Sequence, residues 1–289
     1  MKQFTLRKSM PVAEVSAVFV GRISAENKQI LVTGSDAGTA RTWDLDFTGA
    51  WIHEFVGHGA KTAAVSATPD GTRLVTRGDD DTVRIWDLGS GNQLKTIPGC
   101  TGGPSVSPDG TQIAVLKGER AELWDFSAHC IRTVAAQTQK INSVSFSPDG
   151  ETVVTAGEDG IVGLWEARKS HQKKSIQASR EPVNAVTFSP DGQLLASGGA
   201  DMTLRLHRTS TGGLVKAWPP GVSPLTGVRF VPPDGGVLAS NAEDGSLTFW
   251  RTDGTPEGRL NGSATTFTFT SDGKTLITGY EGDVCSWSG

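Results

Sequence analysis

The residues of this chain that could hold a metal or carry out catalysis are few and widely spaced. Apart from His58, the histidines lie in different parts of the sequence with no zinc-ligand spacing: His53, His129, His171 and His207. The three cysteines form no C-x-x-C pair, so we expect neither a metal knuckle nor a disulfide framework: Cys100, Cys130 and Cys285. The G-x-G triplets precede no helical pattern, which argues against a helix-based phosphate site. We therefore predict no metal and no cofactor.

Composition and charge narrow the classes of partner. The chain has 289 residues, and its 36 glycines and 14 prolines are typical of a globular protein rich in turns. A formal net charge of −4, spread along the sequence, argues against a nucleic-acid or membrane-surface partner. The N-terminal stretch lacks an apolar signal segment, and no apolar run is long enough to cross a membrane. Together with three unpaired cysteines, these features predict a cytoplasmic protein.

One motif repeats along the whole sequence. The stretch VSFSPDGETVVTAGEDGIVGLWE starts at Val144, and similar stretches start at Val65 and Val186. Aligning the copies places a tryptophan, replaced once by histidine, in each of seven units: Trp43, Trp86, Trp124, Trp165, His207, Trp250 and Trp287. By subtraction, successive separations lie between 37 and 43 residues, so the unit is regular while its outer loops vary in length.

Each unit has the pattern of a four-stranded antiparallel meander. Two apolar strands flank Pro-Asp-Gly, in which proline presets φ, aspartate bonds the local backbone and glycine accepts a positive φ. The aspartate recurs in six units: Asp70, Asp109, Asp149, Asp191, Asp234 and Asp272. A second turn leads to the tryptophan strand, and a weaker fourth strand follows. Both faces of each unit are apolar, as expected for a sheet packed between two neighbouring sheets.

The frame V-x-F-S-P-D-G…G-x-D-x-T-V-R-x-W-D resembles the WD40 repeat, and Asp44, Asp87 and Asp125 complete the Trp-Asp dipeptide. The resemblance covers essentially the whole chain in seven copies. It implies an all-β fold, a seven-bladed β-propeller of four-stranded antiparallel blades around a central channel. We predict a single domain over residues 1–289, because a generic β-sandwich would not explain seven positions in register.

The two ends of the sequence are predicted to complete one blade together. The last residues, DVCSWSG, form the third strand of unit seven, and no fourth strand follows them. Residues 1–10 contain KQFTLRK, which matches a fourth strand and precedes unit one. We therefore expect residues 1–10 to supply the outer strand of the last blade, which closes the ring and removes two exposed sheet edges.

The resemblance also implies a structural polar set inside some blades. Unit two contains the complete set: His58, Thr76, Asp80 and Trp86. The hydroxyl, histidine and aspartate of this set are also the residue types of a hydrolase triad, which needs an exposed nucleophile and an oxyanion hole. We expect a buried structural network in which Asp80 orients His58, and we predict no catalytic residue.

In such propellers, the turn between the second and third strands and the link entering each blade share one mouth of the channel. The residue before the structural aspartate should lie there, and six candidates follow: Asp36, Asp79, Lys117, Glu158, Glu243 and Tyr280. Lys117 and Tyr280 depart from the usual acidic residue, and an exposed tyrosine is a frequent binding anchor. The links add four further candidates, of which Trp218 could instead end a fourth strand in the interior: Lys61, Lys140, Arg180 and Trp218.

These features favour a non-enzymatic interaction or scaffold module, a monomeric propeller that binds a protein or peptide across this mouth. One alternative is a recognition or sensor domain of a larger chain that binds a small ligand. Another is an enzyme that uses the central channel, but of the titratable groups on the first strands only Arg229 stands out. A nucleic-acid partner is not predicted, because one basic stretch, EARKSHQKK, on an acidic protein is a weak signal.

Overall fold

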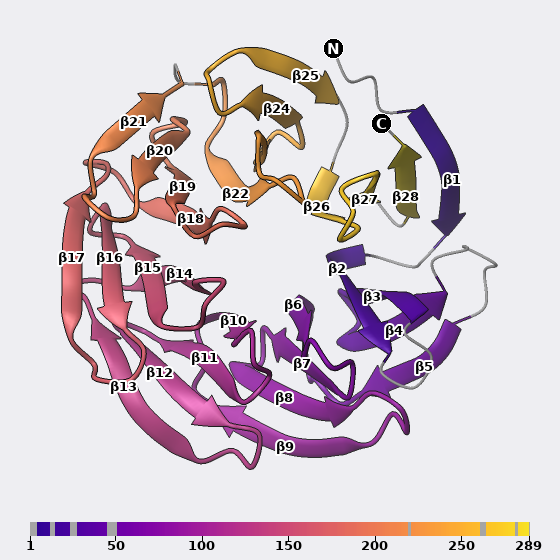
Figure 1. Ribbon diagram of the computed structural model, residues 1–289. Coiled ribbons are helices and arrows are strands. Elements are labelled where there is room, and N and C mark those ends of the chain that lie inside the picture. Colours follow the sequence, from indigo (N-terminus) through magenta and orange to yellow (C-terminus); the bar gives the residue numbers. More distant parts are fainter. Residues whose placement is uncertain are drawn as a thin grey trace.

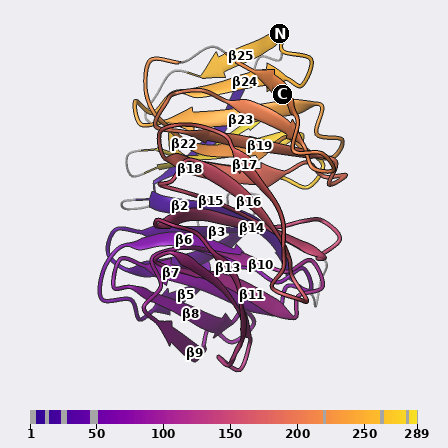
Figure 2. The ribbon, with the colours of Figure 1, turned by 90° about the vertical axis from the view of Figure 1, so that its left-hand side faces the viewer.

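The computed structural model describes residues 5–11, 15–23, 28–44, 51–218, 221–260, 264–280 and 283–288. Within these ranges the chain forms strands and turns but no helix, and therefore no helix that could span a membrane. The strands make seven four-stranded antiparallel sheets, arranged as the blades of a ring (Figure 1). Figure 2 shows the same ring from its edge. The predicted all-β, seven-bladed propeller is confirmed.

In blades 1 to 6 the strands follow one another in chain order from the channel outward (Figure 1). Blade 1 contains β2 (Val15–Ile23), β3 (Lys28–Ser35), β4 (Thr39–Asp44) and β5 (Trp51–Val56). Blade 2 contains β6 (Thr62–Ala67), β7 (Arg73–Gly78), β8 (Thr82–Asp87) and β9 (Gln93–Pro98). Blade 3 contains β10 (Gly102–Val106), β11 (Gln112–Lys117), β12 (Arg120–Asp125) and β13 (Cys130–Ala136).

The next three blades repeat the same order. Blade 4 contains β14 (Ile141–Phe146), β15 (Thr152–Gly157), β16 (Ile161–Glu166) and β17 (Gln172–Gln177). Blade 5 contains β18 (Val183–Phe188), β19 (Leu194–Gly199), β20 (Arg205–Arg208) and β21 (Leu214–Ala217). Blade 6 contains β22 (Leu225–Phe230), β23 (Val237–Ala242), β24 (Leu247–Arg251) and β25 (Pro256–Leu260).

Blade 7 is assembled from both ends of the chain. It contains β26 (Ala264–Phe269), β27 (Thr275–Tyr280), β28 (Asp283–Ser288) and β1 (Thr5–Pro11), in the order β26-β27-β28-β1. The antiparallel pairing runs along β1, from Thr5 opposite Ser288 to Pro11 opposite Asp283. The predicted ring closure by an N-terminal strand is therefore confirmed, and this pairing covers the edge of β28.

The repeated tryptophan occupies the same place in every blade, on the third strand. Trp86 lies opposite Leu74 of the second strand, and Trp165 lies opposite Val153 in the same way. In blade 5, His207 takes this position opposite Leu195. The fixed register explains the repeat in the sequence, because a shift by one residue would turn the large ring to the other face of the sheet.

The core is divided among the contacts between neighbouring blades. In the described part of the chain, seven clusters of buried apolar residues occur, and each joins two adjacent blades. Trp86, for example, packs with Phe55 of blade 1, with ring centroids 5.7 Å apart. Each blade thus buries both faces, which is why the sequence shows little alternation of apolar and polar residues.

The Pro-Asp-Gly turns are held by a side-chain bond that recurs around the ring. In blade 4 the Ser147 hydroxyl donates to Asp149 at 2.5 Å, and the Glu151 N–H donates to the same carboxylate at 2.9 Å. Equivalent hydroxyl–aspartate bonds occur at Asp70, Asp109, Asp191 and Asp272. Gly150 has a φ of 72°, which favours glycine. The turn residues are therefore required by the hairpin geometry.

These turns are expected to make the protein sensitive to acid. Hydrogen bonds from Ser147 and the Glu151 N–H hold the pKa of Asp149 below its ordinary value, and Asp109 and Asp191 are held down in the same way. A carboxylate with a lowered pKa in the fold stabilises the protein above its unfolded pKa, about 4, and loses this contribution as the pH falls further. The free energy of unfolding should therefore decline below pH 4.

Asp149→Asn tests this effect at one turn. We expect it to lower the free energy of unfolding by about 1 kcal/mol at pH 7, with the difference from wild type disappearing toward pH 2. Chemical denaturation at a series of pH values measures both. Glu158→Gln, at an exposed turn position whose side chain has no described hydrogen bond, is the control and should change little. A pH-independent cost of Asp149→Asn would contradict the electrostatic origin.

Candidate functional site

One mouth of the channel is formed by the links that enter the blades and the turns between second and third strands. In blade 2 the Asp79 N–H donates to the Lys61 carbonyl at 2.8 Å. In blade 4 the Glu158 N–H donates to the Lys140 carbonyl at 2.9 Å. In blade 6 the Glu243 N–H donates to the Pro224 carbonyl in the same way. These two sets of segments, which we call the link mouth, therefore lie together in the described blades.

Asp36, Lys61 and Asp79 at the link mouth have charged partners. The Lys61 ammonium lies 2.9 Å from the Asp36 carboxylate and bridges blades 1 and 2, with both side chains nearly half exposed. Asp79 accepts a hydrogen bond from Arg77 at 2.7 Å. Exposed pairs of this kind contribute about 0–1 kcal/mol, so a partner could separate them at low cost.

Four other predicted residues are exposed and form no ion pair with another described residue: Lys140, Glu158, Arg180 and Glu243. Lys140 and Glu158 lie together in blade 4, where their backbones are bonded. Arg180 belongs to the link entering blade 5, and Glu243 follows β23 in blade 6. Of the predicted residues, those with exposed charges and no described ion pair therefore lie on blades 4 to 6.

The position expected for Lys117 is wrong by one residue. Lys117 ends β11 and pairs with Arg120, which leaves residues 118–119 in the turn, whereas Gly78 pairs with Thr82 and leaves residues 79–81. The turn of blade 3 is thus one residue shorter, and Lys117 matches Gly78 rather than Asp79. Its half-buried ammonium lies 4.6 Å from the ring centroid of Trp124, so it is not a free cation at the rim.

Tyr280 shows the same register. It ends β27 and pairs with Ala264 and Asp283, so it also occupies the place of Gly78. The side chain of Tyr280 lies outside the described part of the structure. Its departure from an acidic residue therefore reflects strand register, and its role as an anchor stays a prediction.

Trp218 does not lie on the exposed surface expected for a partner anchor. Its side chain is 2% exposed and packs in the cluster between blades 5 and 6. Its backbone N–H donates to the Leu204 carbonyl, as an extension of the outer pairing of blade 5. The sequence also allowed Trp218 to end a fourth strand in the interior, and this alternative describes its position. Burying the large apolar indole is more favourable than leaving it exposed to water.

The polar set of blade 2 is brought together inside the blade. His58 Nε2 lies 2.8 Å from the Thr76 hydroxyl oxygen, and His58 Nδ1 lies 3.0 Å from Asp80 Oδ1. Trp86 Nε1 donates to the same Thr76 oxygen at 2.9 Å. Asp80 also accepts from the Thr82 hydroxyl and the Gly59 N–H.

A neutral His58 satisfies every one of these bonds. Its Nδ1–H donates to Asp80, and its Nε2 accepts the Thr76 proton while Thr76 accepts from Trp86. Burial lowers the pKa of His58, although Asp80 acts in the opposite direction. Although burial acts to raise it, bonds from Thr82, Gly59 and His58 hold the pKa of Asp80 well below its ordinary range. Thr76 is fully buried, so it cannot present a nucleophile to a substrate.

The other blades retain parts of this arrangement. The tryptophan donates to a second-strand threonine at 2.9 Å in blades 1, 4 and 7, at Trp43, Trp165 and Trp287. In blade 4, Gln137 takes the place of His58 and bonds Asp159 at 3.0 Å. The full chain from tryptophan to aspartate is described only for blade 2, so that blade is the one most tightly held by polar contacts.

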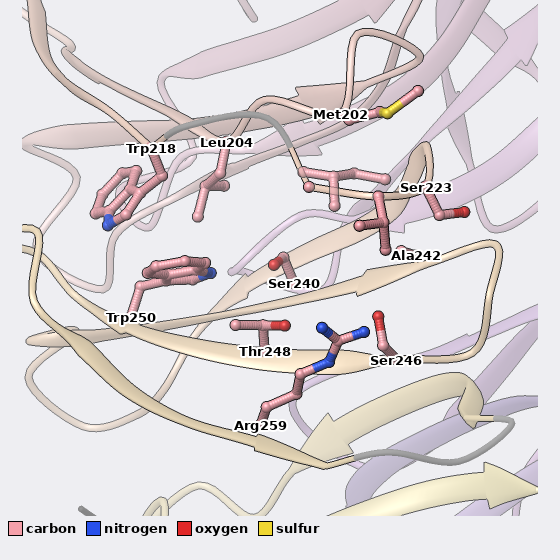
Figure 3. Close-up of a pocket in the computed structure, with 13 residues that line it drawn as sticks. Met202, Leu204, Trp218, Ser223, Ser240, Ala242, Ser246, Thr248, Trp250 and Arg259 are labelled. Atoms are coloured by element: carbon pink, nitrogen blue, oxygen red, sulfur yellow. The ribbon is translucent and has the colours of Figure 1, made fainter.

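Two cavities were not predicted from the sequence. One, of about 390 Å³, lies at the end of the channel near the Pro-Asp-Gly turns and includes Arg229, whose side chain is exposed. The other, of about 320 Å³, lies between blades 5 and 6 beside Trp218 and Trp250 (Figure 3). Among the described residues, no group of three or more His, Cys, Asp or Glu could hold a metal ion.

The fold and the repeated polar register define a β-propeller of WD-type repeats, and comparison with known proteins agrees. The family model "WD domain, G-beta repeat" (WD40) matches residues 49–87, 128–166 and 170–208, which cover units in blades 1–2, 3–4 and 4–5. These matches show WD40 repeats within the seven-bladed ring.

Several curated proteins are similar to parts of this chain. Nuclear distribution protein PAC1-2 of Uncinocarpus reesii is 24% identical over 172 residues, which cover 50% of this chain and 37% of that protein. Protein groucho of Drosophila melanogaster is 27% identical over 160 residues, or 52% of this chain and 20% of groucho. The WD repeat-containing protein 26 homolog of Arabidopsis thaliana is 27% identical, covering 49% and 25%. The chain thus spans a minority of the length of these relatives.

Proposed function

We propose that this protein is a non-enzymatic interaction or scaffold module that binds a protein or peptide at the link mouth. The observation that supports this most directly is the set of exposed charged side chains on blades 4 to 6, which have no described ion-pair partner. They project from turns on a rigid ring, where a partner gains contacts without ordering the scaffold. We further propose a monomer in the cytoplasm, without a nucleic-acid partner.

The enzyme alternative is less favoured for a chemical reason. The only hydroxyl–histidine–aspartate chain described in the structure is inside blade 2, and each of its atoms is already bonded within the network. A hydrolase would need a hydroxyl open to substrate and donors for the oxyanion. We therefore propose a structural role for His58, Thr76, Asp80 and Trp86.

The link mouth is tested by reversing the charges of Lys140 and Arg180 together. We expect Lys140→Glu with Arg180→Glu to reduce capture of the native partner at least tenfold, because both cations contact acidic groups of the partner. Immobilised protein is exposed to native lysate, and proteins held by the wild type are quantified by mass spectrometry. The melting temperature should stay within a few degrees, since both side chains are exposed.

The matched control reverses two cations on the opposite mouth, Arg168→Glu with Lys169→Glu. Both side chains are more than three-quarters exposed, and the change in net charge is the same. The Ala167 N–H donates to the carbonyl of Glu151, next to a Pro-Asp-Gly turn. This bond places the loop at the end of the blade opposite the link mouth. Loss of capture in the control alone would show that the other mouth is the binding surface. Tyr280→Ala, tested in parallel, asks whether blade 7 contributes an anchor.

A further inference from the structure

The cavity between blades 5 and 6 has an origin that can be traced to one residue. Strand pairing aligns blade 6 with blade 2, because Leu225 pairs with Ala242 as Thr62 pairs with Gly78. His58 lies four residues before Thr62, and Gly221 lies four residues before Leu225. Glycine therefore stands in blade 6 where blade 2 has the histidine.

The remaining members of the polar set are kept in blade 6. By the same alignment, Ser240 matches Thr76, Asp244 matches Asp80 and Trp250 matches Trp86. A Cβ added to Gly221 would meet no atom closer than the Met202 carbonyl oxygen at 3.8 Å, so the space is open. The cavity of about 320 Å³ thus occupies the region that an imidazole fills in blade 2, enlarged toward blade 5.

The walls of this cavity are suited to a flat ring. Trp218 and Trp250 form one side, with centroids 6.1 Å apart and planes at 51° (Figure 3). Leu204 and Leu225 add apolar surface. Indole faces and edges favour aromatic partners, and the volume is within the range of small-molecule sites.

The polar groups of the cavity are mostly hydrogen-bond donors. The Trp250 N–H points toward Ser240 without forming a described bond, whereas the equivalent Trp86 donates to Thr76 (Figure 3). The Arg259 guanidinium extends into the cavity beside Thr248 (Figure 3). Its described ion pair is with Asp244 at 3.5 Å, which leaves most of its five N–H donors available. The lining contains no carboxylate, so a ligand with an anionic acceptor fits.

We propose that this cavity binds a small planar aromatic carboxylate, with the ring against the tryptophan pair and the carboxylate on Arg259. Arg259 can hold a carboxylate through two parallel bonds, while the Trp250 N–H and the Ser240 and Thr248 hydroxyls can bond its remaining acceptor sites. The site does not depend on the proposed partner at the link mouth. It would give the propeller a small-molecule input in addition to its surface.

Indole-3-carboxylate is the probe, and uncharged indole is the comparison ligand. Binding is followed by titration calorimetry and by the indole N–H resonances in ¹H–¹⁵N spectra of the intact protein. We expect indole-3-carboxylate to shift the Trp250 resonance and to bind at least tenfold more tightly than indole. No saturable shift at Trp250, or equal affinity for the two ligands, would overturn the proposal.

Two variants test the site by independent routes. Arg259→Gln should weaken binding of indole-3-carboxylate at least tenfold, and Arg208→Gln, at an exposed position outside the cavity, should not. Gly221→His should abolish binding, because its side chain would enter the open space at this wall of the cavity. Wild-type affinity in either Arg259→Gln or Gly221→His would place the ligand elsewhere and overturn the proposal.

Discussion

Deletion of residues 1–9 is expected to lower the free energy of unfolding by about 3 kcal/mol or more and to promote aggregation. The deletion removes most of β1 and therefore its backbone bonds to β28, each of which contributes about 1 kcal/mol. It also leaves β28 as an open edge that can pair with another chain. Chemical denaturation and light scattering at several protein concentrations measure the two effects.

Leu6→Ala is the matched control for this deletion. The Leu6 side chain is 49% exposed, so truncating it keeps the backbone pairing while removing little buried surface. We expect a change of about 0.5 kcal/mol or less. If the deletion melted like wild type, the pairing of β1 would contribute nothing to the ring.

His58→Ala is expected to destabilise the protein by about 2–3 kcal/mol at pH 7.5. The change removes the acceptor of the Thr76 hydroxyl and one donor to Asp80, and leaves both groups in place inside blade 2. Gln137→Ala should cost about 1 kcal/mol or less, because Gln137 bonds Asp159 but has no described bond to Thr155, the counterpart of Thr76. Equal costs for the two variants would contradict a special role for the blade 2 network.

The cost of His58→Ala should also depend on pH. Burial lowers the pKa of His58 in the fold, so the unfolded chain takes up a proton first as the pH falls through about 6.5. His58 therefore stabilises the fold fully above that pH and loses part of this contribution below it. The difference between wild type and variant should shrink between pH 7.5 and pH 5. His207, whose pKa is also lowered by burial, is present in both proteins and cancels.

The architecture could be predicted from local chemistry. Trp86 and Trp165 recur because each sits at one register position on a third strand, and Asp149 recurs because the hairpin needs its carboxylate to bond Ser147 and the backbone. Such constraints act within about twenty residues, so they leave a periodic pattern in the sequence. The closure by β1 was predictable for a similar reason, since the strand count of the last unit was one short.

Which side chains lie on the surface depends largely on contacts between neighbouring blades. Lys117 is an exception decided within blade 3, because a turn shorter by one residue places it at the end of β11, over Trp124. Trp218 became buried because blade 6 packs against the outer end of blade 5. The cavity beside it lies where Gly221 has no side chain, at the position that His58 occupies in blade 2. The sequence by itself determined the blades and their turns, whereas packing between blades decided which side chains face solvent, because that burial depends on residues about forty positions away in the chain.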